Sequence, residues 1–238
     1  MLNKQFYLLH IPKTGGTSVS LSLYNSLHQN GLKSYPNKRP PHEKNLSEYV
    51  YIGAHLGRNP INSIDNLSVG CILRNPISRS ISNFLWIKDS ILENKYKNVK
   101  DKLRHYLFED PDYFDHYNIQ TRFICNNQKP IDMIDYQIWS RNWYLNNKLD
   151  VNFAKSELDC FEIVGTQDKH RDFTVKVHDW FDKNYNIKIE YNIERHDLKS
   201  ETSEYLLNTL TKSEKEKILN NNYKDYELYA HAKERVSK

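Results

Sequence analysis

The sequence predicts an α/β fold in which a mostly parallel central sheet is flanked by helices. Short apolar runs that end in Gly, Pro or a charged residue recur along the chain, as strands of a buried sheet do. Segments with apolar residues at helical spacing lie between these runs, and strands that alternate with helices favour a parallel sheet covered on both faces. No Pro/Gly/Ser-rich linker divides the 238 residues. We therefore expect a single domain over residues 1–238.

The elements are expected in a regular order along the chain. The expected strands cover residues 6–11, 49–53, 69–74 and 160–165, with 187–191 as a candidate fifth strand. The expected helices cover residues 17–29, 76–88, 92–107, 136–149, 168–185 and 211–235. Residues 31–47 contain three prolines and no periodicity, which predicts a surface excursion, with a lid over a substrate as the alternative.

Charge and cysteine content narrow the class of protein. The net charge of +4 is mild, so nucleic-acid binding is not implied, although anionic ligands are favoured. The cysteines Cys71, Cys125 and Cys160 are odd in number and lack paired spacing, which predicts reduced thiols. The first strand begins close to Met1, and no apolar run approaches the length of a membrane span. We expect a soluble, cytoplasmic protein with neither nucleic acid nor membrane as partner.

A loop after the first strand predicts an anion site. Pro12 ends that strand, and two glycines follow before the helix begins. Glycines let the backbone approach a ligand closely, and the new helix directs unpaired N–H groups and its positive dipole end at the loop. The segment reads Lys13, Thr14, Gly15, Gly16, Thr17, Ser18. It is not the nucleotide triphosphatase loop, because Lys13 precedes the glycines; an ordinary strand-to-helix turn is the alternative.

A second anion site is predicted where the strand 69–74 meets the next helix. Pro76 suits the first turn of that helix, so Arg74 stands at the strand end and Ser82 about two turns into the helix. A guanidinium and a hydroxyl placed on this corner suit one phosphate. The alternative is that Arg74 pairs with a surface carboxylate and Ser82 faces a neighbouring helix.

Together the two segments resemble the sulfotransferases that use 3'-phosphoadenosine 5'-phosphosulfate (PAPS), especially the carbohydrate branch that includes heparan sulfate 2-O-sulfotransferase. In that family a Pro-Lys-Thr-x-x-Thr-Ser loop holds the 5'-phosphosulfate. An Arg-Asp-Pro motif, with a serine eight residues after the arginine, holds the 3'-phosphate. Residues 12–18 match the loop, and Arg74, Pro76 and Ser82 match the second motif. The resemblance implies a P-loop-kinase-like sulfotransferase fold with PAPS as co-substrate and a hydroxylated acceptor, in particular a saccharide.

Further segments extend the resemblance over most of the chain. Residues 51–55 look like the family's strand ending in Gly-His, which implies that His55 is the catalytic base. Residues 118–123 look like its Gln-x-Arg helix, residues 163–166 like its Val-Gly-x-Thr strand end, and residues 225–229 like a later helix. The chain departs from the family pattern at three places. Asn75 replaces an aspartate but keeps a capping side chain, and Gln167 stands where many members have a glutamate. Ala54 and Leu56 flank His55 differently from the residues in the heparan sulfate enzyme.

The resemblance gives the site residues their expected roles. Lys13 would stabilise charge on the leaving phosphate, His55 would accept the proton of the acceptor hydroxyl, and backbone N–H groups would hold the 5'-phosphate. His10 is the rival base, although packing against the loop is its expected role. No metal is expected, because neither His-Glu-x-x-His nor Cys-x-x-Cys occurs.

Several residues keep two interpretations. Gln120 and Arg122 either help to hold the donor or acceptor or form a plain helix stripe. The residues that either line an acceptor pocket or belong to the core are Trp86, Trp139, Trp143 and Tyr144. The histidines expected at surface or packing positions are His105, His116, His170, His178, His196 and His231. Two other functions stay open: a nucleotide or metabolite kinase, and a nucleotide-binding module without catalysis.

Overall fold

The computed structural model of the chain describes residues 4–35, 46–55, 66–91, 98–109, 117–125, 149–189, 191 and 200–237. Its centre is a five-stranded, all-parallel sheet with the order β2-β3-β1-β4-β5. The strands are β1 (Gln5–Leu9), β2 (Ser34–Tyr35), β3 (Tyr51–Ala54), β4 (Leu67–Leu73) and β5 (Ile163–Thr166). The predicted α/β class and the parallel sheet are therefore confirmed.

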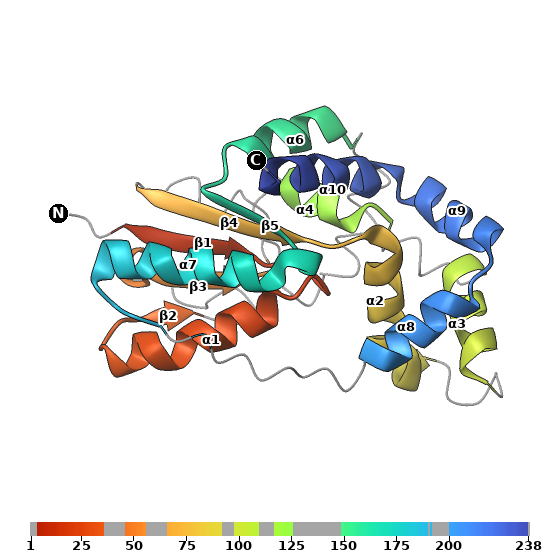
Figure 1. Cartoon of the computed structure of the whole chain (residues 1–238), viewed down its shortest axis with the longest axis horizontal. Coiled ribbons are helices and arrows are strands. Elements are labelled where there is room, and N and C mark those ends of the chain that lie inside the picture. The colour runs from red at the N-terminus through yellow and green to blue at the C-terminus, as the bar shows by residue number, and fades with distance from the viewer. Residues whose placement is uncertain are drawn as a thin grey trace.

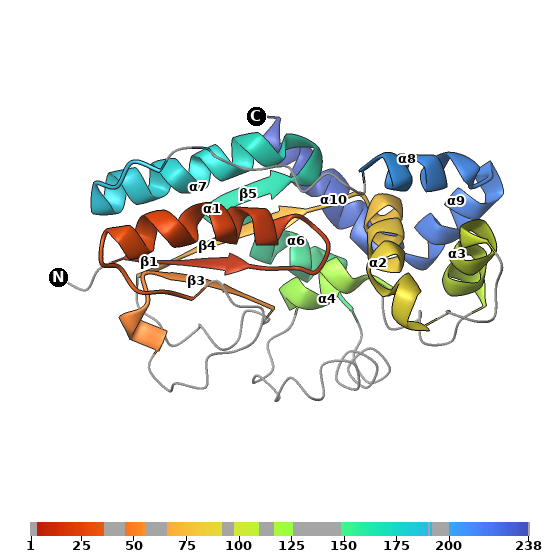
Figure 2. The same ribbon diagram turned by 90° about the horizontal axis from the view of Figure 1, so that it is seen from below.

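Helices cover both faces of the sheet (Figure 1 and Figure 2). One face packs against α1 (Gly16–Gln29) and α7 (His170–Tyr185). The other packs against α4 (Ile119–Cys125), α6 (Val151–Asp159) and α10 (Tyr223–Val236). Successive residues of β1 alternate between these two cores, with Phe6 and Leu8 in the first and Tyr7 and Leu9 in the second. A strand buried on both faces is apolar throughout, which explains why this run was readable in the sequence.

A third group of helices lies beyond the carboxyl ends of the strands (Figure 2). It consists of α2 (Pro76–Ile91), α3 (Val99–Phe108), α8 (Ser200–Thr209) and α9 (Lys212–Asn221). These helices share a core of their own that includes Ile81, Phe84 and Leu103. Short 3-10 turns at Leu46–Glu48 and Gln167–Lys169 precede β3 and α7.

The topology directs attention to the end of β1. This strand pairs with β3 on one side and β4 on the other. The chain therefore builds outward from β1 through α1 to β2 and β3, and then crosses to the opposite side of β1. In open α/β sheets, ligands bind beyond the carboxyl ends of the strands, where the strand order reverses in this way. The loop that contains Lys13 follows β1 at this point.

The prediction of the fifth strand was wrong. The described residues of the stretch 187–191 form no strand. Ile187 packs into the same core as α1 and α7 without belonging to a strand. The fifth strand is β2, which lies inside the segment that was expected to be a surface excursion. It pairs with β3 over two residues only, which is too short for a periodic pattern. Residues 36–45, which make up most of the proposed lid, lie outside the described residues.

The helix predictions were largely confirmed, with differences at several positions. The helix expected at 211–235 is divided at Asn222 into α9 and α10, because the Asn222 side chain accepts a hydrogen bond from the N–H of Asn118 at 3.0 Å while its backbone leaves the helical conformation. The helix expected at 92–107 begins at Val99 within the described residues. That expected at 136–149 lies almost wholly outside them. Helices α6 and α8 were not predicted.

Two further observations concern the environment of the protein. In the part of the chain that the structure describes, none of the helices combines the length and apolar character needed to cross a lipid bilayer. All three cysteines are free: Cys71 is buried in the sheet, Cys125 is half-buried and Cys160 is exposed. Burial raises the pKa of the Cys71 thiol well above its usual value.

Candidate functional site

The loop after β1 has an unusual backbone. Lys13 and Gly15 have positive φ angles of 67° and 106°, and Thr14 between them does not. Alternation of this kind is typical of the anion-binding concavities that successive N–H groups form. The left-handed region disfavours a residue with a side chain by about 1–2 kcal/mol, so the conformation of Lys13 is strained, while glycine at position 15 avoids that cost.

Carbonyl groups of this loop are bonded to surrounding donors. The Thr14 hydroxyl donates to the carbonyl of Ile11 at 2.9 Å, and Arg74 Nη1 donates to that of Lys13 at 3.2 Å. The carbonyl of Gly15 accepts from Ser18 N at 3.2 Å and from His170 Nε2 at 3.1 Å. The N–H of Thr14 shares a peptide with the carbonyl of Lys13, and the N–H of Gly16 shares one with the carbonyl of Gly15. Because C=O and N–H point in opposite directions across a trans peptide, both N–H groups face away from the donors that bind these carbonyls.

The corner between β4 and α2 is held on both sides. The side-chain amide of Gln120 accepts from Arg74 N at 2.8 Å and donates to Arg74 O at 2.9 Å. Asn75 Oδ1 accepts from the N–H groups of Ile77 at 3.0 Å and Ser78 at 3.3 Å, so the expected helix cap is confirmed. Pro76 is the first residue of α2, as predicted.

The guanidinium of Arg74 is a half-buried cation beside the loop. Its pKa is lowered to about 10, chiefly by burial and also by the charge of Arg79, while Tyr229 opposes the shift. Among the described residues, no group accepts a hydrogen bond from the buried Arg74 Nε. A buried polar group without a partner destabilises a protein by about 1–3 kcal/mol, and more when it is charged. An anion bound beside the guanidinium would compensate its positive charge.

Lys13 reaches toward α2. Its Nζ lies 5.8 Å from the ring centroid of Trp86, and Trp86 is 65% exposed. Trp86 is therefore not a core residue, which was one of its two interpretations. Ser82 precedes Trp86 by four residues, so both lie on the same face of α2. The amine of Lys13 thus lies over the helix face that carries the half-buried Ser82.

His55 follows β3 directly and contacts the residue at the end of β1. Its Nδ1–H donates to the backbone carbonyl of His10. A carbonyl only accepts, so the neutral ring of His55 has its lone pair on Nε2. The rings of His10 and His55 pack with their centroids 4.3 Å apart. The buried ring of His10 also lies under the loop, where a Cβ added to Gly16 would come within 2.8 Å of Nε2.

A pair of reciprocal helix caps supports the corner from behind. Asp225 of α10 accepts from the first N–H groups of α4, those of Gln120 at 3.1 Å and Thr121 at 2.8 Å. Asn118, just before α4, accepts in turn from the first N–H groups of α10, those of Lys224 at 3.0 Å and Asp225 at 3.2 Å. Through Gln120, α10 therefore fixes the backbone at the end of β4. These contacts join distant segments and have no local sequence signal.

The structure brings most of the sequence-predicted site residues to one edge of the sheet. Direct contacts link the 13–18 segment to Arg74 and to His10, and His10 to His55. Ser82 is linked to this group only through its place on α2. Of the two residues whose role was open, Gln120 holds the Arg74 backbone, and Arg122 is almost fully buried. The positions Trp139, Trp143 and Tyr144 lie outside the described residues.

Sequence reasoning missed His170 as a neighbour of the loop. It was placed among surface or packing histidines, yet its ring contacts Gly15. The only available signal was its position shortly after β5, whose carboxyl end lies at the same sheet edge.

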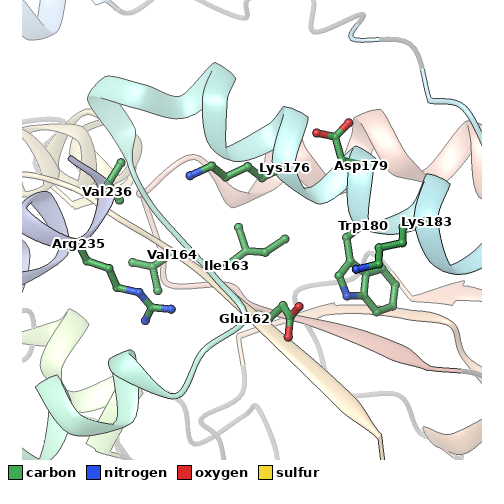
Figure 3. Close-up of a pocket in the computed structure, with 9 residues that line it drawn as sticks. All are labelled: Glu162, Ile163, Val164, Lys176, Asp179, Trp180, Lys183, Arg235 and Val236. Atoms are coloured by element: carbon green, nitrogen blue, oxygen red, sulfur yellow. The ribbon is translucent and has the colours of Figure 1, made fainter. Parts of the chain in front are cut away.

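A hollow of about 320 Å³ lies elsewhere, against the edge strand β5 and between α7 and α10 (Figure 3). The residues that line it are Glu162, Ile163, Val164, Lys176, Asp179, Trp180, Lys183, Arg235 and Val236. They adjoin the amino end of β5, and none of the sequence-predicted site residues is among them. This hollow is therefore separate from the candidate site.

Two further findings bear on function. Within the described ranges, no group of three or more His, Cys, Asp or Glu side chains is arranged to hold a metal ion. The chain matches none of the protein-family models and none of the curated proteins with which it was compared.

Proposed function

We propose that the protein is a PAPS-dependent sulfotransferase that transfers the sulfonate group to a hydroxyl of an acceptor, either a carbohydrate or another polar metabolite. One observation carries this proposal: Arg74 donates to the carbonyl of Lys13 at 3.2 Å, while its Nε is buried without an acceptor among the described residues. A half-buried cation therefore adjoins a loop whose N–H groups suit a phosphate. A nucleotide with anionic groups at both the 5' and the 3' position of its ribose would use both features.

The donor would be held through its 5'-phosphosulfate and its 3'-phosphate. The 13–18 segment would bind the 5'-phosphosulfate, with contacts from the N–H groups of Gly15, Gly16 and Thr17. Thr14 would contribute its N–H, because its hydroxyl already donates to Ile11. Ser18 would contribute its hydroxyl, because its N–H already donates to Gly15.

The 3' side of the donor would lie at the corner between β4 and α2. Arg74 and Ser82 would bind the 3'-phosphate, as their match to the family motif implies. Arginine suits this role because its planar group can donate two parallel hydrogen bonds to one phosphate.

The transfer itself would need alignment and charge compensation more than covalent catalysis. The bond from sulfur to the phosphate oxygen breaks as a bond from sulfur to the acceptor oxygen forms. The proton of the acceptor hydroxyl passes to Nε2 of His55, which carries the lone pair in the neutral ring. The Lys13 ammonium compensates the charge that develops on the phosphate oxygen.

A cytoplasmic location is part of the proposal. The three free thiols support it, since reduced cysteines are typical of a compartment that keeps thiols reduced.

The proposal is tested by following labelled sulfonate from PAPS to a panel of saccharides and small hydroxylated metabolites, with and without a chelator. Transfer that persists with the chelator is the expected result. Phosphoryl transfer from ATP that the chelator abolishes would instead support the kinase alternative. Tight binding of adenosine 3',5'-bisphosphate with no transfer to any acceptor or to water would support the non-catalytic module.

A further inference from the structure

We propose that His170 is a positioning residue that fixes the orientation of the Gly15–Gly16 peptide in the loop after β1. His170 is the first residue of α7, and its Nε2 lies 3.1 Å from the carbonyl oxygen of Gly15. Because the carbonyl can only accept, Nε2 carries the proton and donates it to this hydrogen bond. Only the nucleotide-binding part of the test depends on the proposed function.

The ring of His170 also covers the loop sterically. A Cβ added to Gly15 would lie 2.9 Å from His170 Cδ2 and 3.2 Å from Nε2. Contacts under 3.0 Å force a displacement, so the ring packs directly on the Gly15 backbone. His170 thus makes both an apolar contact and a hydrogen bond to the same residue.

The peptide between the two glycines is the part of the loop that most needs an external partner. Glycine adopts positive and negative φ with similar ease, so a peptide with glycine on both sides can rotate at little steric cost. Rotation would turn the Gly15 carbonyl oxygen toward the side where the Gly16 N–H points. A carbonyl oxygen there would repel an anion, whereas the N–H attracts it. The bond from His170 opposes that rotation together with the bond from Ser18 N, and of the two it is the one that comes from outside the loop and its helix.

His170 is well placed for this role because its own position is fixed. The Thr174 hydroxyl, one turn along α7, donates to the His170 carbonyl at 2.9 Å and lies 3.4 Å from Nδ1. One residue before Thr174, Phe173 packs so closely on β5 that a Cβ on Gly165 would lie 2.5 Å from its ring. The donor that holds the loop therefore belongs to an element anchored on the sheet, which favours precise positioning.

Two substitutions separate the hydrogen bond from the packing. His170→Phe keeps a ring over Gly15 but removes the donor, whereas His170→Gln keeps an N–H donor near the position of Nε2 but removes the ring. His178→Phe is the matched control. His178 lies two turns further along the same helix, where its ring nitrogen bonds Ser22 of α1 at 3.0 Å, away from the loop.

The first measurement is nucleotide affinity by calorimetry. His170→Phe is expected to weaken adenosine 3',5'-bisphosphate about three- to tenfold, the usual effect of one hydrogen bond, and to leave adenosine 3'-monophosphate unchanged. His170→Gln and His178→Phe are expected to bind both nucleotides as the wild type does. Equal losses for both nucleotides, or wild-type affinity in His170→Phe, would overturn the proposal.

The second measurement uses the free protein and is independent of the proposed function. Nuclear magnetic resonance relaxation dispersion at the Gly16 amide should show exchange on the microsecond to millisecond scale in His170→Phe but not in His170→Gln. If the wild type binds no bisphosphate, the proposed function fails, and the relaxation measurement alone then decides the role of His170. A Gly16 amide that is equally rigid in His170→Phe and the wild type would contradict that role.

Discussion

Arg74 and Lys13, 61 residues apart in the sequence, meet through a 3.2 Å hydrogen bond from the guanidinium of Arg74 to the backbone carbonyl of Lys13. The contact joins the end of β4 to the loop after β1, across two neighbouring strands of the sheet. It places a half-buried cation where the strand order reverses. The proposed donor site depends on this juxtaposition.

Removal of the Ser82 hydroxyl should weaken nucleotides with a 3'-phosphate selectively. Ser82→Ala is expected to reduce the affinity for adenosine 3',5'-bisphosphate about threefold to tenfold, the effect of one hydrogen bond, while adenosine 5'-monophosphate binds unchanged. Arg74→Ala should cause a larger loss, about ten- to a hundredfold, because its bonds are to a charged group. Calorimetric titration of each variant with both nucleotides checks this. Equal losses for the two nucleotides would refute the assignment of the 3'-phosphate to this corner.

Lys13 should affect turnover more than donor affinity. The substitution Lys13→Ala removes the charge that compensates the leaving phosphate, a contribution that for a single stabilising group amounts to about 10²–10³ in kcat. Lys13→Arg keeps the charge and should recover part of this loss. Lys176→Ala, which removes a lysine of α7 at the separate hollow, serves as the control and should leave turnover unchanged. Steady-state rates with labelled PAPS decide the point, and wild-type turnover in Lys13→Ala would exclude the role.

His55 should be required for turnover through Nε2 alone. His55→Asn keeps an N–H that can donate to the carbonyl of His10 but has no basic nitrogen, whereas His55→Ala loses both. Both variants are expected to lose about 10²–10⁴ in turnover, with adenosine 3',5'-bisphosphate affinity unchanged in His55→Asn. Near-normal turnover in either variant would make His10 the better candidate for the base.

Gly16 and His10 should behave as one coupled pair. Gly16→Ala is expected to destabilise the protein and weaken nucleotide binding, because the new Cβ would overlap the His10 ring. His10→Ala frees that space, so the double variant should be less impaired than the two separate effects predict. Urea unfolding of the four proteins measures this coupling. Additive effects would mean that the ring does not restrict position 16.

Stability should fall in mild acid through His178. Burial lowers the pKa of this imidazole below its usual value, although Asp179 and the backbone of Ile189 oppose the shift. The unfolded chain takes up a proton near its usual pKa of about 6.5 while the folded chain resists, so the free energy of unfolding falls as pH drops below about 6.5. In His178→Gln the difference in unfolding free energy between pH 7.5 and 5.5 should be smaller. An undiminished difference would assign the acid sensitivity to other groups.

The sequence predicted those parts of the site that local chemistry determines. Pro12 and the two glycines indicated the loop, and Asn75 with Pro76 indicated the helix start, because turn and cap residues act on their immediate neighbours. The resemblance then drew attention to His55 and Gln120. None of these inferences needed knowledge of a distant contact.

The remainder of the site depends on contacts between distant segments. His170 reaches Gly15 across 155 residues, and Asp225 reaches Thr121 across 104. Such pairs follow no periodicity, and beyond the position of His170 shortly after β5 the sequence carries no signal for them. The short strand β2 and the break at Asn222 were missed for the same reason, since pairing and capping by distant residues determine both.

The most direct test of the central claim is a calorimetric titration of the wild-type chain with adenosine 3',5'-bisphosphate, adenosine 5'-monophosphate and adenosine 3'-monophosphate. If the loop holds the 5'-phosphate and Arg74 the 3'-phosphate of one nucleotide, the bisphosphate should bind at one molecule per chain and about ten times more tightly than either monophosphate. Equal affinity for the bisphosphate and one monophosphate, or no binding of the bisphosphate, would contradict the claim.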